Sequence, residues 1–97
     1  VTRKAGAANA AGCMGVVCSG LEAGRIKEAI DQDFLAVTPG IRPAWTMTAE
    51  EDQRRITTPA EAIRAGADYL VIGRPIRDAK DPVNAAARIA AEIESAL

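Results

Sequence analysis

Residues 65–76 read AGADYLVIGRPI, in which a short apolar run at 69–72 ends at a Gly-Arg-Pro sequence. Two similar apolar runs occupy residues 15–18 and 34–37. None of the three alternates polar with apolar side chains. Short continuous apolar runs bounded by turn residues are typical of strands buried on both faces of a parallel sheet. We therefore predict three parallel strands, each apolar on both faces.

Helix start signals lie between the predicted strands. Ser19 with Glu22, and Thr58 with Glu61, have the spacing of capping boxes, in which side chain and backbone cap each other. Pro59 occupies the first helical position of the second box, which proline favours. One helix is therefore predicted after each of the first two strands, the second following a long loop.

The sequence also predicts where the helix after Thr58 ends and two further helices near the ends of the chain. Gly66 closes the helix that begins after Thr58, because glycine is preferred just past a helix end. Asp81-Pro82 is a capping residue followed by proline, and the apolar residues after it recur at helical spacing. An alanine-rich helix is expected over residues 2–11.

The resulting order of elements is typical of an α/β fold. Strands that alternate with helices indicate βα units with right-handed crossovers. The 97 residues allow one domain at most. Four helices cannot cover three strands that are apolar on both faces while the sheet edges stay open, since small domains bury little surface. The chain is therefore predicted either to oligomerise through its sheet edges or, as we favour, to be part of a larger barrel.

Composition excludes several classes of function. The net charge is −1 and only three residues are aromatic, so nucleic-acid binding is not expected. No apolar run is long enough for a membrane span. With two cysteines and no histidine, a zinc or iron–sulfur site built from this chain alone is not expected. Cys18 is predicted to be a buried core thiol, and such thiols are typical of the cytoplasm.

Two segments that follow predicted strands carry candidate binding residues. Arg42 lies in residues 37–43, VTPGIRP, and Gly73-Arg74 follows the last strand. Loops that follow strands lie on the catalytic face of a (β/α)8 barrel, where phosphate sites are frequently found. Glycine lets the backbone approach an oxyanion, and arginine offers a bidentate, permanently charged fork. A solvated loop arginine is the alternative interpretation at each position.

These segments are long, ordered and correctly spaced for one known family. Residues 37–43, 52–56, 58–59 and 65–76 resemble the C-terminal part of bacterial orotidine 5'-monophosphate decarboxylases, and residues 15–19 with 22–23 resemble that family's sixth strand and the helix after it. The resemblance covers essentially the whole chain. It implies that residues 1–97 form the C-terminal part of a (β/α)8 TIM barrel, with strands six to eight. Strands one to five are then not in this chain.

The resemblance also implies roles for individual residues. Arg74 and the amide of Gly73 would hold the 5'-phosphate of the substrate. Gln53 would bridge phosphate and pyrimidine, Arg42 would anchor the loop over the phosphate, and Pro39 would line the pyrimidine side. The loop from 40 to 57 would close over the nucleotide. Without the resemblance, Arg42 and Gln53 could equally belong to a solvated loop.

The family's chemistry is expected to lie outside this chain. It uses a lysine on one early strand and an Asp-x-Lys-x-x-Asp cluster on another, without metal or cofactor. The nearest sequence here is 78–81, DAKD, whose second aspartate comes too early and is needed as a helix cap. The resemblance therefore implies a cytoplasmic lyase of pyrimidine (UMP) biosynthesis that forms homodimers. This chain would contribute no catalytic residue and would be inactive alone.

Two rival functions remain open from the sequence. One is a fragment of another phosphate-binding barrel, such as an aldolase or a sugar-phosphate synthase, although the residues 38–43 and 52–53 discriminate against it. The other is a non-catalytic module that binds nucleotide or assembles through its open sheet edges.

Overall fold

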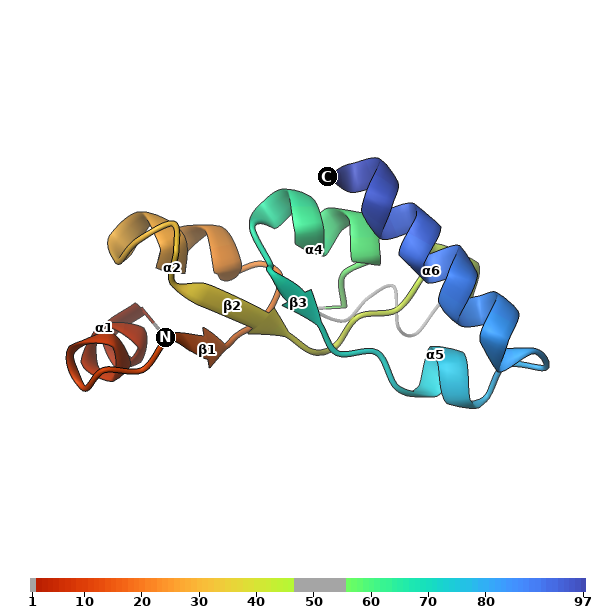
Figure 1. Ribbon diagram of the computed structural model, residues 1–97, viewed down its shortest axis with the longest axis horizontal. Coiled ribbons are helices and arrows are strands. Elements are labelled where there is room, and N and C mark those ends of the chain that lie inside the picture. The colour runs from red at the N-terminus through yellow and green to blue at the C-terminus, as the bar shows by residue number, and fades with distance from the viewer. Residues whose placement is uncertain (1, 47–55) are drawn as a thin grey trace.

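Three parallel strands form the sheet of this protein, whose structure is a computed structural model that describes residues 2–46 and 56–97 (Figure 1). The strands β1 (Gly15–Val17), β2 (Leu35–Thr38) and β3 (Tyr69–Leu70) pair in the order β1-β2-β3. In register, Val16 lies opposite Ala36, and Thr38 lies opposite Leu70. The predicted α/β class and the three parallel strands are confirmed.

The helices lie between and after the strands, as Figure 1 shows. They are α1 (Thr2–Ala10), α2 (Ala23–Ala29), α4 (Pro59–Ala65), α5 (Arg74–Arg77) and α6 (Pro82–Ala96), with a 3₁₀ turn, η1, at Ala44–Thr46. The single-turn helix α5 was not among the elements predicted from sequence. A four-residue helix offers too few residues for a periodic pattern.

Helix capping follows the sequence prediction at α4 and α6. Thr58 accepts a hydrogen bond from the amide of Glu61, whose side chain accepts one from the amide of Thr58. Gly66 ends α4 with a φ of 113°, a left-handed conformation that glycine adopts without steric cost. Asp81 caps α6 by accepting from the amide of Asn84.

The capping box predicted at Ser19 is wrong. Helix α2 begins later, with Glu22 as its N-cap residue and no side-chain cap. The Ser19 hydroxyl instead donates to the Glu22 carboxylate at 2.9 Å. The two side chains bond each other and not the backbone amides, because a turn separates Ser19 from the first turn of the helix.

Burial on both faces of the strands is contradicted for this chain. Ala36 and Thr38, on the face covered by α2 and α4, are fully buried. On the opposite face, Val17 is 70% exposed and Tyr69 is 61% exposed. Successive strand residues point to opposite faces, so one side of the sheet stays open. The predicted core thiol Cys18 is buried, and burial raises its pKa.

Helix α6 packs against both α4 and α5 (Figure 1). Ala85 and Ile89 are its buried residues. The Glu92 carboxylate accepts a hydrogen bond at 2.9 Å from the amide of Ala60, in the first turn of α4. Among the described residues, no helix is both long and apolar enough to cross a membrane.

An ion pair between a buried lysine and a partly exposed aspartate joins α2 to the sheet at the amino ends of β2 and β3. The ammonium of Lys27, a residue only 7% exposed, lies 2.6 Å from the carboxylate of Asp68 and also donates to the carbonyl of Gln32. Asp68 also accepts from the amide of Ala36 at 2.9 Å. Partial burial alone would raise the pKa of Asp68, but the hydrogen bonds from Lys27 and Ala36 and the lysine charge outweigh it and lower that pKa.

We expect Asp68→Asn to lower the free energy of unfolding at pH 7 by roughly 2 kcal/mol, because it removes the counter-ion of the buried Lys27 while Asp68 itself is partly screened by solvent. Since the pKa of Asp68 is lower in the folded state, the stabilisation is present above about pH 4 and is lost as pH falls through the folded pKa. Urea denaturation at pH 7 and at pH 3 measures both effects. Glu28→Gln, at an exposed position of α2, is the control. An Asp68→Asn difference that did not shrink at low pH would contradict this account.

Candidate anion-binding site

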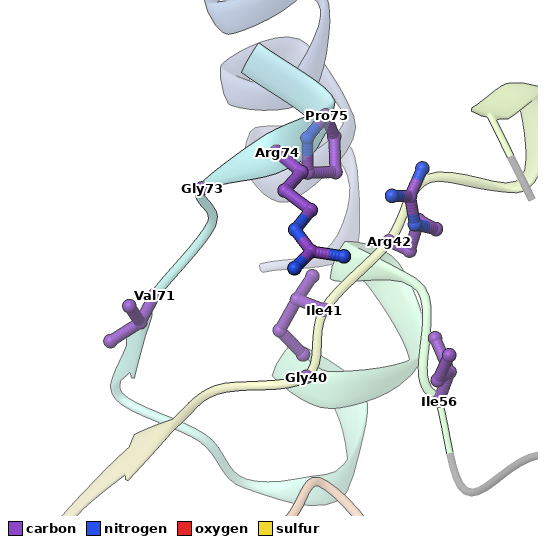
Figure 2. Close-up of a pocket in the computed structure, with 8 residues that line it drawn as sticks. All are labelled: Gly40, Ile41, Arg42, Ile56, Val71, Gly73, Arg74 and Pro75. Atoms are coloured by element: carbon purple, nitrogen blue, oxygen red, sulfur yellow. The ribbon is translucent and has the colours of Figure 1, made fainter. Parts of the chain in front are cut away.

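A hollow of about 300 Å³ opens at the edge of the sheet where β2 and β3 end. Figure 2 shows the residues that line it: Gly40, Ile41, Arg42, Ile56, Val71, Gly73, Arg74 and Pro75. The segments after two neighbouring parallel strands thus meet here. In open α/β sheets, ligands bind in crevices outside the carboxyl ends of the strands.

Backbone contacts hold the segment after β2 in place. Gly40 has a φ of 69°, which lets the chain turn sharply after the strand. Ile41 is buried, packs with Ala62 of α4 and forms a parallel bridge with Thr57. The amide of Arg42 donates to the carbonyl of Thr57 at 3.0 Å. These contacts anchor the backbone from which the Arg42 side chain extends.

The segment after β3 leads directly into α5. The amide of Val71 continues the sheet by donating to the carbonyl of Thr38 at 2.9 Å. Gly73 is the N-cap residue of α5, and its carbonyl accepts from the amide of Arg77 at 2.9 Å. In Figure 2 the Arg74 side chain extends from α5 back over Ile41. A buried Pro75 anchors the turn that carries Arg74.

The charges near the hollow are predominantly positive. Asp78 has a lowered pKa, chiefly because Arg77 donates to its carboxylate at 3.0 and 3.3 Å. The positive charges of Arg74 and Arg42 also lower the pKa of Asp78, and these three residues line a common hollow. Two permanent positive charges at one hollow favour an anionic ligand, and arginine is suited to phosphate and carboxylate groups.

A second hollow of about 270 Å³ shares the same two arginines. Its other lining residues are Trp45, Thr46, Pro75, Asp78, Ala79 and Lys80. The η1 turn forms one wall, and α5 with the residues after it forms the other. Arg42 and Arg74 therefore contribute to the walls of both hollows.

The structure brings together three of the five residues that the sequence analysis assigned to binding. Arg42, Gly73 and Arg74 line the first hollow. Pro39 is exposed at the end of β2 and is not among the residues lining either hollow in the described part of the chain. Gln53 lies outside the described residues, as does the middle of the loop predicted over 40–57.

Sequence analysis missed the apolar part of the lining. The apolar residues that line the hollow are Ile41, Ile56 and Val71. Nothing in the sequence around each of them distinguishes a residue that lines a site from an ordinary apolar residue. The strand register would have been the useful signal for Val71, because it continues β3 alongside Thr38. Ile56 is adjacent to Thr57, which pairs with Ile41, and only the tertiary structure shows that pairing.

Two acidic residues that the structure describes near the site, Asp78 and Asp81, serve structural roles. Asp78 pairs with Arg77, and Asp81 caps α6 through the amide of Asn84. Within residues 2–46 and 56–97, no group of three or more histidine, cysteine or acidic side chains could hold a metal ion. The site therefore combines positive charge with an apolar floor and suits an anionic group attached to a larger ligand.

Comparisons with known proteins agree on one family. The model of the orotidine 5'-phosphate decarboxylase / HUMPS family matches residues 1–89. A protein of Desulfosudis oleivorans named orotidine 5'-phosphate decarboxylase is 55% identical over 97 residues, which are 100% of this chain and 39% of that protein. One of the same name from Geobacter sulfurreducens is 58% identical over 93 residues, which are 96% of this chain and 38% of that protein.

A solved structure shares the same fold. The crystal structure of orotidine 5'-phosphate decarboxylase from Lactobacillus acidophilus superimposes with a TM-score of 0.79 at 41% identity, covering 96% of this chain and 36% of that one. The present chain thus spans about two fifths of the length of the curated relatives it matches.

Arg74→Gln is expected to weaken binding of inorganic phosphate about tenfold or more, since a charge-assisted hydrogen bond and a permanent positive charge are lost. Chemical shifts of the Gly73 and Arg74 amides, followed by NMR during a phosphate titration, give the dissociation constant. Arg77→Gln is the matched control, because Arg77 lies on the same short helix but pairs with Asp78. Equal weakening by both variants would show a diffuse charge effect and not a site at Arg74.

Proposed function

Because the chain belongs to the orotidine 5'-phosphate decarboxylase / HUMPS family, we propose that it is the C-terminal part of a lyase that converts orotidine 5'-monophosphate to uridine 5'-monophosphate. The relatives that carry this name support the proposal. The observation that carries it is the hollow shared by Arg42, Gly73 and Arg74. Such a site suits the 5'-phosphate of a nucleotide.

In this proposal each site residue has a defined role. Arg74 holds two oxygens of the phosphate through its guanidinium fork, and the amide of Gly73 donates to a third. A Cβ at Gly73 would meet no other heavy atom within 4 Å, so the chain's own packing leaves the space beside that amide unused. Arg42 adds positive charge from the opposite wall, and Gln53 reaches the phosphate and pyrimidine from the loop.

The phosphate does not react, yet holding it contributes to catalysis. Binding energy from a remote part of the substrate can be used to orient and distort the reacting part. We propose that this chain supplies that binding energy. The lysine and aspartates that act on the carboxylate would lie in the remaining N-terminal part of the barrel, and no cofactor or metal would be needed.

The open face of the sheet supports the barrel assignment. Val17, Tyr69 and Val71 are more than half exposed, and apolar side chains at neighbouring positions of a sheet are normally covered. We propose that β1, β2 and β3 are strands six to eight of a (β/α)8 barrel and that this face lines the barrel interior. The complete protein would be a cytoplasmic homodimer acting in pyrimidine biosynthesis.

Decarboxylation is expected from a complete barrel and not from residues 1–97 alone. We would replace the matching segment of the D. oleivorans relative with this chain and follow loss of orotidine 5'-monophosphate by ultraviolet absorbance. The chimera should turn over the substrate, and the purified 97-residue chain should not. Competition by uridine 5'-monophosphate but not by ribulose 5-phosphate would separate this function from that of a sugar-phosphate enzyme. Substantial turnover by the chain alone would refute the division of roles.

Gly73→Ala is expected to leave the free energy of unfolding within about 1 kcal/mol of the wild type, because the added methyl group meets no protein atom. It should nevertheless raise the KM of the chimera for orotidine 5'-monophosphate about tenfold or more, since the methyl group enters the space proposed for the phosphate. Gly6→Ala, in α1, is the control, because a Cβ there also meets nothing within 4 Å. An unchanged KM for Gly73→Ala would remove Gly73 from the site.

A further inference from the structure

Arg88 of α6 stacks on the indole ring of Trp45. Its guanidinium carbon lies 4.2 Å from the ring centroid. Both residues are at least partly exposed, Trp45 to 38%. This cation–π contact links the segment after β2 to α6. The elements α4, β3 and α5 lie between the two in the chain.

The turn that carries Trp45 also supplies a hydrogen-bond acceptor for the Arg42 guanidinium. In η1, the amide and the hydroxyl of Thr46 both donate to the carbonyl of Pro43 at 3.0 Å. The Arg42 guanidinium in turn donates to the carbonyl of Thr46 at 3.3 Å. A displacement of η1 would therefore move the acceptor that orients Arg42.

The same helix supports the other arginine of the site. Helix α6 packs against α5, whose first residue is Arg74, and α6 is fixed to α4 through Glu92 and the amide of Ala60. Figure 1 shows α6 lying along both shorter helices. One helix thus holds α5 by packing and η1 through Arg88. These two contacts therefore act on the two elements that carry or contact the guanidinium groups of the site.

We propose that Arg88 is a positioning residue for the phosphate grip and acts through Trp45. It holds η1 against α6 so that Arg42 stays beside Arg74 at the shared hollow. Arg88 itself lines neither hollow, so it acts without touching the ligand. This inference rests on the proposed function, because it assumes that the anion held between Arg42 and Arg74 is the phosphate of a nucleotide.

A structural role alone makes a different prediction from a positioning role. If Arg88 only stabilised the fold, its loss would affect a ligand with a phosphate and one without it alike. If Arg88 positions Arg42, loss of Arg88 should weaken the binding of only the ligand that carries the phosphate. Uridine 5'-monophosphate and uridine are the pair of probes that differ in this group alone.

The experiment measures inhibition constants for both probes in the chimera described above, with Arg88→Met, Arg88→Lys and Trp45→Phe. Arg88→Met should raise the constant for uridine 5'-monophosphate about two- to fivefold, as expected for loss of an exposed cation–π contact. It should leave the constant for uridine unchanged. Arg88→Lys and Trp45→Phe, which keep a cation and a ring, should recover part of the loss.

A matched control and a second measurement keep the test independent of folding. Arg64→Met removes an exposed arginine from neighbouring α4 and should change neither constant. Trp45 is the only tryptophan of the 97-residue chain, so its acrylamide quenching reports the contact directly and should increase in Arg88→Met. The Trp45→Ala/Arg88→Met double variant, compared with Trp45→Ala and Arg88→Met made singly, should bind uridine 5'-monophosphate no more weakly than the weaker of the two single variants.

Three outcomes would overturn the inference. In the first, Arg88→Met binds uridine 5'-monophosphate as tightly as the wild type does. In the second, Arg88→Met weakens the binding of uridine and of uridine 5'-monophosphate equally, which would leave only a structural role for Arg88. A wild-type chimera that binds uridine as tightly as uridine 5'-monophosphate would overturn the phosphate site itself, and with it the proposed function. The first two outcomes leave the proposed function standing.

Discussion

The parallel pairing of β2 with β3 is the constraint on which the site depends. Hydrogen bonds from the amide of Asp68 to Ala36 and from the amide of Val71 to Thr38 hold the two strands in register. Because both strands run in the same direction, the segments that follow them leave the sheet at the same edge. A slip of one residue would turn each side chain to the other face. Arg42 and Arg74 would then no longer share a hollow.

The two edges of the sheet have different roles. At the amino ends of β2 and β3, the Lys27–Asp68 ion pair ties α2 to both strands. At the carboxyl ends, the arginines and Gly73 leave a polar hollow. The charges of Lys27 and Asp68 at the first edge pair with each other, while the arginines at the second edge line the hollow proposed to bind a ligand. Stability and binding are thus separated, so residues of one edge can be tested with limited effect on the other.

Helix α6 contributes to the site although none of its residues lines the first hollow. It covers α4 and α5 on one side and stacks Arg88 on Trp45 on the other. A site formed by two loop segments needs a common support, because loops alone hold side chains less accurately than helices and strands do. The open face of the sheet has no such support within the described residues. In the proposed barrel, the remaining strands would cover this face.

Much of this arrangement could be predicted from local sequence. The apolar runs, the Thr58 and Asp81 caps and Gly66 determine where most strands and helices lie, because backbone preference and capping depend on neighbouring residues. The positions of Arg42, Gly73 and Arg74 after strands predict binding roles for them, and the structure brings the three to one hollow. The Ser19 cap was misassigned, since the spacing of a capping box does not reveal where the first helical turn begins. The one-turn helix α5 was too short to give a pattern.

By itself, then, the sequence determined the order of the elements, the parallel sheet and the residues that carry the positive charge. Tertiary structure alone decided which face of the sheet is covered, the pairing of Ile41 with Thr57, and the contact of Arg88 with Trp45. The physical reason is distance along the chain. A cap or a strand is set by adjacent residues, whereas these contacts join segments whose meeting depends on how every intervening element packs.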